Sequence, residues 1–257
     1  MRKIVLAAAA AFVLPSLVSL APAFAAEEVK PMEHEWHFDG VLGKFDKQQL
    51  QRGFQVYKEV CASCHSLNYI SFRNLQDIGY SEDQVKVIAA EYQVTDGPDE
   101  NGDMFQRPAR PSDHIPKPFA NEQLARASNG GALPPDLSLM TKAREDGPNY
   151  VYSLMLGYKD PPNGFELNPG MSYNEFFPGH QIAMPQQVTE DRVTYADGTK
   201  ATAEQIAQDV VAFLHWTAEP KLEVRHATGV RVILFAFLFT VLAYFYKRRL
   251  WARLEKH

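Results

Sequence analysis

The sequence predicts a mainly helical domain with long loop insertions, joined to one C-terminal transmembrane helix. Apolar residues recur at helical spacing in several segments, and the stretches between them are rich in proline, glycine and asparagine. An uncharged apolar segment also lies near the C-terminus. The mean hydropathy of -0.29 excludes a polytopic membrane protein, whereas a hydrophobic content of 46% is enough to bury a core.

The first 25 residues have the features of a secretory signal peptide. Arg2 and Lys3 precede an apolar run, and small residues at Ala23 and Ala25 favour cleavage after Ala25, with Ala26 as the alternative. This run is too short for an N-terminal membrane anchor. Because no repeat or Gly-Ser linker divides the chain that follows, we expect residues 26–225 to form one exported domain.

Three segments of this domain have helical periodicity. The first begins near Asp46 and runs into a cysteine motif, with one face formed by Leu50, Phe54, Tyr57 and Cys61. The second begins near Asn149 and is brief, because Gly157 follows it. The third follows a capping box predicted between Thr202 and Gln205.

Long loops are expected between these helices. Residues 96–118 contain several prolines, and residues 158–185 are rich in proline, glycine and asparagine. The strand signal is limited to a short hairpin around residues 193–200, with a turn at Ala196-Asp197-Gly198. Loops of this length usually surround a ligand or contact a partner.

The transmembrane helix is predicted at residues 226–246. Residues 232–246 carry no charge, and at about 1.5 Å per residue the longer segment spans about 30 Å, provided that Arg231 reaches the interface. The basic run Lys247–Arg249 follows at once and indicates that residues 247–257 are cytoplasmic. The exported domain then lies on the other side of the membrane.

Charge is divided unevenly along the chain. Of the 26 Lys and Arg residues, two lie in the signal peptide and six lie from Arg231 onward, whereas of the 31 acidic residues only Glu255 lies beyond Arg231. The exported domain therefore has a net charge of -12 and the segment from Arg231 onward +5. Such an acidic surface argues against a nucleic acid partner, and it serves either solubility or the docking of a basic partner.

The chain has only two cysteines, and both lie in the motif Cys61-Ala62-Ser63-Cys64-His65. This is the c-type haem attachment sequence, in which the two thiols form thioethers with the haem vinyl groups and the imidazole binds the iron. A zinc half-site would lack its second pair of ligands, and a redox dithiol would lack a βαβ setting. We therefore predict one covalently attached haem c, with His65 as an iron ligand.

The second axial ligand decides between electron transfer and chemistry at an open iron. A methionine thioether favours electron transfer because it leaves no position for oxygen or peroxide. Met184 is favoured because Pro185 holds the backbone before it extended, as suits a loop that crosses a haem face. Met104 and Met171 come next. Packing roles suit the other methionines, Met32, Met140 and Met155. The rival ligands are His114, His180 and His215.

The ordered set of motifs along the chain resembles the cytochrome c1 family. Besides the cysteine motif and the C-terminal apolar helix, it comprises residues 121–126 (NEQLAR), 131–138 (GALPPDLS), 149–153 (NYVYS), Tyr158, 177–180 (FPGH) and 182–185 (IAMP). The resemblance covers nearly the whole chain after the signal peptide. One CxxCH motif fits any c-type cytochrome, whereas this ordered set is far more specific.

The resemblance implies a class I cytochrome c-like fold with long loop insertions and a C-terminal helix beside cytochrome b. It also implies that Met184 is the axial thioether, that Arg126 neutralises a haem propionate, and that Pro134 and Pro135 form part of the wall at the haem edge. Some bacterial members carry a disulfide near the methionine loop, for which this chain has no cysteines. Whatever rigidity such a disulfide gives must therefore come here from packing around residues 176–178.

The expected function is a one-electron relay within a quinol:cytochrome c oxidoreductase, from a Rieske iron–sulfur protein to a soluble or tethered cytochrome c. No independent catalysis is expected from this chain, and the expected location is the bacterial inner membrane with the haem domain in the periplasm. The acidic residues proposed to steer a basic acceptor are Asp96, Asp99, Glu100 and Asp103. The alternatives are an anchored cytochrome that feeds an oxidase directly and an exported haem enzyme or sensor with an open iron.

Overall fold

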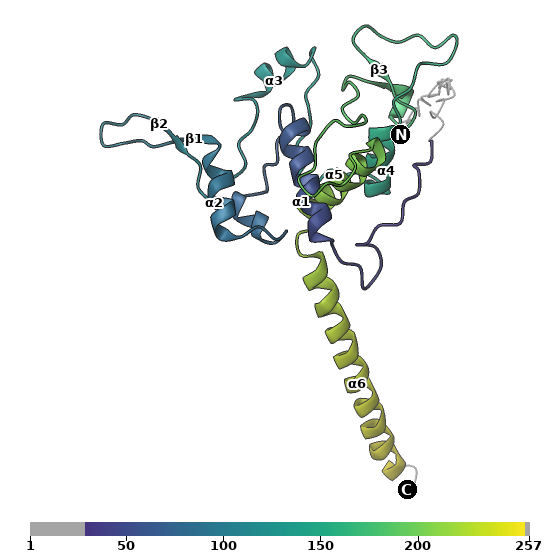
Figure 1. Cartoon of the computed structure of the whole chain (residues 1–257). Coiled ribbons are helices and arrows are strands. Elements are labelled where there is room, and N and C mark those ends of the chain that lie inside the picture. Colours follow the sequence, from purple (N-terminus) through teal and green to yellow (C-terminus); the bar gives the residue numbers. More distant parts are fainter. Residues whose placement is uncertain (1–28, 255–257) are drawn as a thin grey trace, which may run out of the picture.

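The computed structural model describes residues 29–254, which form a head of short helices and loops on one long helix (Figure 1). The helices of the head are α1 (Lys47–Val56), α2 (Glu82–Ala90), α3 (Glu122–Ser128), α4 (Gly147–Leu156) and α5 (Ala203–Ala218). Two short 3-10 helices, η2 (Phe72–Gln76) and η3 (Pro178–His180), lie between them. The predicted mainly helical class is confirmed, and the predicted signal peptide lies outside the described residues.

Helix α1 confirms the first predicted helix. The carboxylate of Asp46 caps it by accepting hydrogen bonds from backbone N–H groups of the first turn. Leu50 and Phe54 are buried, as their spacing predicts. The helix continues into a π-helical turn, η1 (Tyr57–Cys61), in which the Ala62 N–H donates to the Tyr57 carbonyl oxygen at 2.8 Å. Such turns often occur at functional sites, and this one carries the chain into the cysteine motif.

Helices α1 and α5 cross in close contact at the centre of the head (Figure 1). Gly53 allows this approach, since a Cβ atom at this position would lie 2.0 Å from the Asp209 carbonyl oxygen and 2.6 Å from the Phe213 Cβ. The buried Phe213 ring packs against Phe54 and Tyr57, with centroid distances of 5.6 and 5.9 Å. The crossing therefore fixes the direction of α1 and the position of the cysteines at its end.

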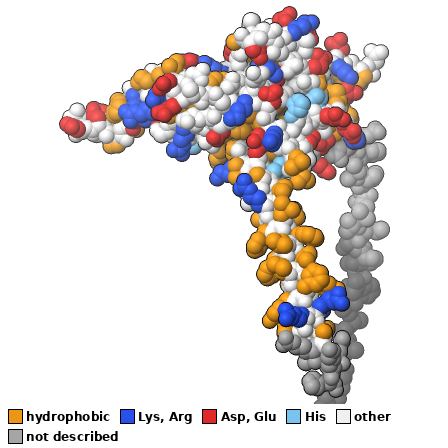
Figure 2. Space-filling model, turned by 60° about the horizontal axis from the view of Figure 1, so that its bottom comes forward, with side chains coloured by type: hydrophobic (Ala, Val, Ile, Leu, Met, Phe, Trp, Pro, Cys, Tyr) orange, Lys and Arg blue, Asp and Glu red, His pale blue; other side chains and the backbone are white. Residues whose placement is uncertain are grey.

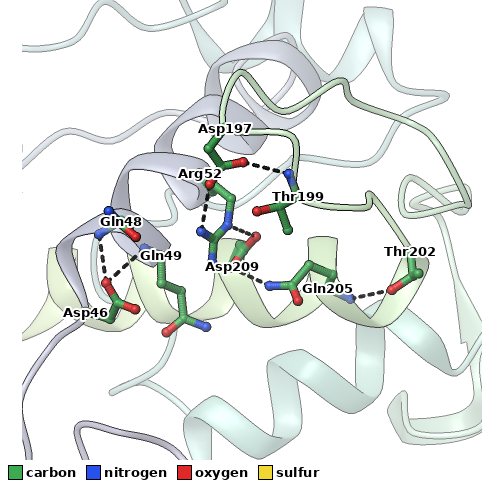
Figure 3. A network of polar contacts seen from close by, with 9 residues as sticks. All are labelled: Asp46, Gln48, Gln49, Arg52, Asp197, Thr199, Thr202, Gln205 and Asp209. Atoms are coloured by element: carbon green, nitrogen blue, oxygen red, sulfur yellow. Dashed lines mark hydrogen bonds and ion pairs between the residues drawn. The ribbon is translucent and has the colours of Figure 1, made fainter.

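The predicted capping box of α5 forms only in part. Thr202 Oγ1 accepts a hydrogen bond from the Gln205 N–H at 3.1 Å, but the Gln205 side chain donates to Asp209 at 2.9 Å (Figure 3). Asp209 is fully buried and is also bound by Arg52 of α1, through Nε at 2.9 Å and Nη2 at 3.1 Å. Arg52 pairs with Asp197 as well, at 3.1 Å. A buried carboxylate is costly unless its oxygens accept hydrogen bonds. The Gln205 side chain therefore donates to Asp209 and does not complete the capping box.

Helix α4 confirms the second predicted helix and ends at Gly157. The hairpin predicted around residues 193–200 is wrong. The turn at Ala196 forms, but no strand flanks it. Val193 and Tyr195 are both buried in the core, and the Thr194 carbonyl oxygen accepts a hydrogen bond from the Gln55 side chain at 2.9 Å. This segment thus packs against α1 instead of pairing with a strand.

Two small antiparallel sheets lie in or directly before the segments that were predicted to be loops. Strand β1 (Gln93–Asp96) pairs with β2 (Phe105–Pro108) in a hairpin that projects from the head (Figure 1). Strand β3 (Ser172–Tyr173) pairs with β4 (Gln181–Ile182). Proline and glycine are found in both turns, at Pro98 and at Pro178, for example. These residues therefore mark the turns correctly, although the paired strands beside them were missed.

Helix α6 (Leu222–Leu254) is longer than the predicted span of residues 226–246. Its 33 residues extend about 50 Å at about 1.5 Å per residue. It is long and apolar enough to cross a membrane, and its most apolar window is 0% buried. Figure 2 shows the hydrophobic side chains along its surface. A helix with apolar side chains exposed all round is typical of a lipid environment.

Candidate haem-binding site

The cysteine motif lies where the helix formed by α1 and η1 ends. The Cys61 carbonyl oxygen accepts hydrogen bonds from the N–H groups of Cys64 at 3.1 Å and His65 at 2.9 Å, so one turn holds the three residues together. Both cysteines are free thiols, partly shielded from solvent. Burial and then the neighbouring Cys64 raise the pKa of the Cys61 thiol to about 12. A raised pKa disfavours the thiolate, which is the form that a reactive redox dithiol needs.

The ring of His65 is oriented by a backbone acceptor. Its Nδ1 donates to the Pro135 carbonyl oxygen at 2.7 Å, which leaves Nε2 free to bind a metal ion. Burial lowers the pKa of His65, although the hydrogen bond to Pro135 opposes this effect, so the ring is neutral at neutral pH. The Tyr57 hydroxyl donates to the His65 carbonyl oxygen at 3.0 Å and fixes the backbone. The residues present therefore fit an axial ligand of a haem iron.

Asp136 fixes the loop that presents Pro135 to His65. Its Oδ2 accepts hydrogen bonds from the Ser66 hydroxyl and the Asn68 N–H, both at 2.8 Å. Its Oδ1 accepts from the Ser138 N–H at 2.9 Å. Sequence reasoning assigned no role to Asp136. The available signal was an aspartate after two prolines, because such a residue often binds the backbone two positions on.

A cavity of about 270 Å³ adjoins this loop. Pro134 and Pro135 line it together with Cys64, as expected for the wall at a haem edge. Residues of the segment 117–125, including the apolar Phe119, also line it. The Cys64 thiol, two prolines and the Phe119 ring together form a lining that fits the edge of a haem.

Arg126 lies on α3, whose residue Ala125 lines the cavity. Arg126 itself is not among the described residues that line this cavity. Its side chain is exposed, and Nη1 donates to the Gly131 carbonyl oxygen at 3.2 Å. The assignment of Arg126 to a haem propionate therefore stays a prediction.

The candidate methionines differ in their packing. Three of them pack against the core, as assigned from the sequence: Met32, Met140 and Met155. Met104 is 61% exposed and Met171 is 39% exposed. Met184 is half-buried in the segment after β4, and its carbonyl oxygen accepts a hydrogen bond from the Tyr158 hydroxyl at 2.9 Å. This contact anchors the segment and favours Met184, which stays the predicted ligand.

The methionine loop is held mainly by the fully buried side chain of Asn174. Its Nδ2 donates to the Leu154 carbonyl oxygen at 2.8 Å, and its Oδ1 accepts from the Phe176 N–H at 3.1 Å. The Phe176 ring packs against Gly157, where a Cβ atom would lie 2.6 Å from it. Pro178 is exposed. The expected packing is therefore confirmed for Phe176 and wrong for Pro178, and the tie made by Asn174 was missed.

The rival histidines have structural contacts. His215 Nδ1 lies 3.2 Å from Thr141 Oγ1, and burial lowers the pKa of this ring to about 4. His180 Nδ1 donates to the Glu175 carbonyl oxygen at 3.0 Å within its own loop. His114 lies in a backbone bridge. The rings of His215 and His180 therefore have partners within the protein, whereas the contact given for His114 is made by its backbone.

The acidic residues proposed for steering lie on the hairpin formed by β1 and β2. Asp96 pairs with Arg107. Asp99 Oδ1 accepts hydrogen bonds from the N–H groups of Asn101 at 2.8 Å and Asp103 at 2.9 Å, which holds the turn. These two carboxylates therefore have local roles, and the exposed Glu100 and Asp103 are the better candidates for contact with a partner.

Comparison with known proteins identifies the family. The model of the cytochrome C1 family matches residues 36–254. Cytochrome c1 of Rhodospirillum rubrum is 48% identical over 85% of this chain and 86% of its own length. The mitochondrial cytochrome c1 1 heme protein of Arabidopsis thaliana is 48% identical over 87% of this chain and 73% of its own length. A protein of Bradyrhizobium diazoefficiens named cytochrome b/c1 is 49% identical over 87% of this chain and 36% of its own length. The chain belongs to the cytochrome c1 family.

Proposed function

We propose that the protein relays single electrons from a Rieske iron–sulfur protein to a soluble or tethered cytochrome c. Family membership indicates a c-type cytochrome of a cytochrome bc1 complex. The relative named cytochrome b/c1 supports cytochrome b as a partner. The observation that carries the proposal is the hydrogen bond of His65 to the Pro135 carbonyl oxygen, because it leaves Nε2 free on the residue that directly follows Cys64.

Four residues hold the haem c in this proposal: Cys61 and Cys64 through thioethers, and His65 and Met184 as axial ligands. When bound, the haem supplies one-electron redox chemistry. Pro135 sets the orientation of the His65 ring. The Tyr158 hydroxyl donates a hydrogen bond to the Met184 carbonyl oxygen and so holds the backbone of Met184 in place. A methionine in this position leaves no open site for oxygen, which suits a relay and not an oxygen-binding enzyme or sensor.

Carbon monoxide binding to the reduced, haem-loaded full chain tests the proposal. We expect the optical spectrum of the native protein to be unchanged by carbon monoxide, and Met184→Leu to bind it. Met171→Leu is a matched control, because this methionine lies beside the same loop and is more exposed. Rapid binding by the native protein would contradict the relay, and binding by Met171→Leu instead would reassign the ligand.

The second test concerns the partners. We expect the native protein, isolated from membranes in mild detergent, to copurify with cytochrome b and a Rieske protein. Copurification with an oxidase alone would support the alternative, an anchored cytochrome that feeds an oxidase directly.

We infer further that α6 anchors the protein in a bacterial inner membrane, with the head in the periplasm. The exposed apolar surface of α6 supports the anchor, and the basic run Lys247–Arg249 at its far end supports a cytoplasmic C-terminus. A protease added to spheroplasts should digest the head and leave a C-terminal tag intact. Loss of the tag with an intact head would contradict this orientation.

A further inference from the structure

A short loop at the base of the head presents two apolar side chains to solvent. Val41 is 68% exposed and Leu42 is 80% exposed, the highest value among the exposed large hydrophobic residues of the described chain. The residues on either side are fixed, because Phe38 is buried in the core and Gly43 is also buried. The Lys44 N–H donates to the backbone of the preceding segment at 2.9 Å and closes the loop. The two side chains are thus held outward by an ordered turn.

The same loop is attached to the first turns of α6. The Phe45 N–H donates to the Glu223 carboxylate at 2.9 Å, and the His226 ring lies 3.4 Å from the Gly43 carbonyl oxygen. His226 is the first residue of the apolar segment 226–246, in which Arg231 is the one Lys, Arg, Asp or Glu residue. Figure 1 shows the purple segment before α1 descending beside the upper end of α6. The loop therefore lies at the level where α6 would enter a bilayer.

We infer that Val41 and Leu42 insert into the interface of the lipid bilayer and form a second membrane contact beside α6. The inference rests on the proposed anchoring by α6. Apolar side chains gain free energy when they leave water for the boundary between headgroups and acyl chains. The exposed Lys44 follows directly and can extend to anionic headgroups.

A second contact has a consequence for the relay. With a single membrane helix, the tilt of the head relative to the membrane depends only on how firmly the head is joined to the first turns of α6. The inserted loop adds a point of attachment at the base of the head, on a segment that also packs into the core through Phe38. It therefore restricts the tilt and keeps the haem site at a constant height above the membrane.

Spin labelling tests the inference on the haem-loaded full chain in phospholipid vesicles. Both native cysteines, Cys61 and Cys64, are occupied by haem in the proposed protein, so an introduced cysteine is a unique labelling site. Nitroxide labels are placed at Leu42→Cys, at the exposed Val87→Cys on α2 and at the exposed Leu238→Cys in the middle of α6. Collisions of each label with oxygen, which concentrates in lipid, are compared with collisions with a water-soluble nickel chelate.

We expect oxygen collisions to exceed nickel collisions several-fold at positions 42 and 238, and the reverse at position 87. Nickel collisions at position 42 equal to those at position 87 would overturn the inference. A label at position 42 that is shielded from both reagents would also overturn it, since it would show a protein contact instead of lipid. An aqueous label at position 238 would show that the anchor itself is wrong. Val41→Cys repeats the measurement if Leu42→Cys does not fold.

Discussion

Loss of the Arg52 guanidinium is expected to destabilise the head strongly. Asp209 is 0% exposed and receives three side-chain hydrogen bonds, two from Arg52 and one from Gln205 (Figure 3). Arg52→Ala removes two of the three and leaves the carboxylate buried without its cation. We expect the free energy of unfolding to fall by about 3–5 kcal/mol, the usual effect of breaking a buried ion pair from one side.

The assay is chemical denaturation of the haem-loaded full chain in detergent micelles, followed by far-UV circular dichroism and by haem absorbance. Lys86→Ala is the matched control, because Lys86 pairs with Glu82 at 2.9 Å on the surface of α2. Its free energy of unfolding should fall by less than about 1 kcal/mol. The double variant Arg52→Met with Asp209→Leu removes both charges together and should recover most of the loss.

Two results would refute this reasoning. A loss below about 1 kcal/mol in Arg52→Ala would show that the Asp209 carboxylate does not depend on its cation. A double variant as unstable as Arg52→Ala would show that the loss does not come from an unpaired buried charge, because this variant contains neither charge.

Three further predictions concern the helix crossing, the methionine segment and the dependence on pH. Gly53→Ala should lower the free energy of unfolding by about 1–3 kcal/mol or more, because its methyl group overlaps the backbone of α5. Gly229→Ala is the control in the same denaturation assay. A methyl group at position 229 meets nothing within 4 Å, so this variant should be neutral. Tyr158→Phe should lower the free energy of unfolding by about 0.5–1.5 kcal/mol, because the hydrogen bond to the Met184 carbonyl oxygen is lost. It should also weaken the near-infrared absorption band of the Met184–iron bond in the oxidised protein. An unchanged band would show that the hydroxyl does not position Met184. Because burial lowers the pKa of His215 to about 4, the unfolded chain takes up its proton first, and stability should fall as pH drops from about 6.5 towards 4. His215→Gln should flatten that part of the urea midpoint profile, and an unchanged profile would assign the effect to other groups.

The helices of the site were predictable because their signals are local. Asp46 and Thr202 are followed within three residues by the N–H groups that they cap. The haem attachment motif also depends only on the short covalent spacing from Cys61 to His65. Such features need no knowledge of the rest of the fold.

Other features depend on segments that are far apart in the chain. The acceptor for His65 is 70 residues away at Pro135, and Arg52 is 157 residues from Asp209. The wrong hairpin has the same origin, because Val193 lies in a segment that packs against α1 and does not pair with a strand. No local pattern records which distant group satisfies a buried polar atom.

From the amino-acid sequence one can therefore derive the chemistry available to this protein: a pair of thiols with a histidine, a favoured methionine, and a helix apolar enough for a membrane. Folding decides how those groups are used. It directs the proton of His65 to a carbonyl oxygen, buries Asp209 against an arginine, and joins the loop that carries Leu42 to the first turns of α6. The physical reason is that spacing is a property of the chain, whereas burial and hydrogen-bond partners arise only when distant segments pack together.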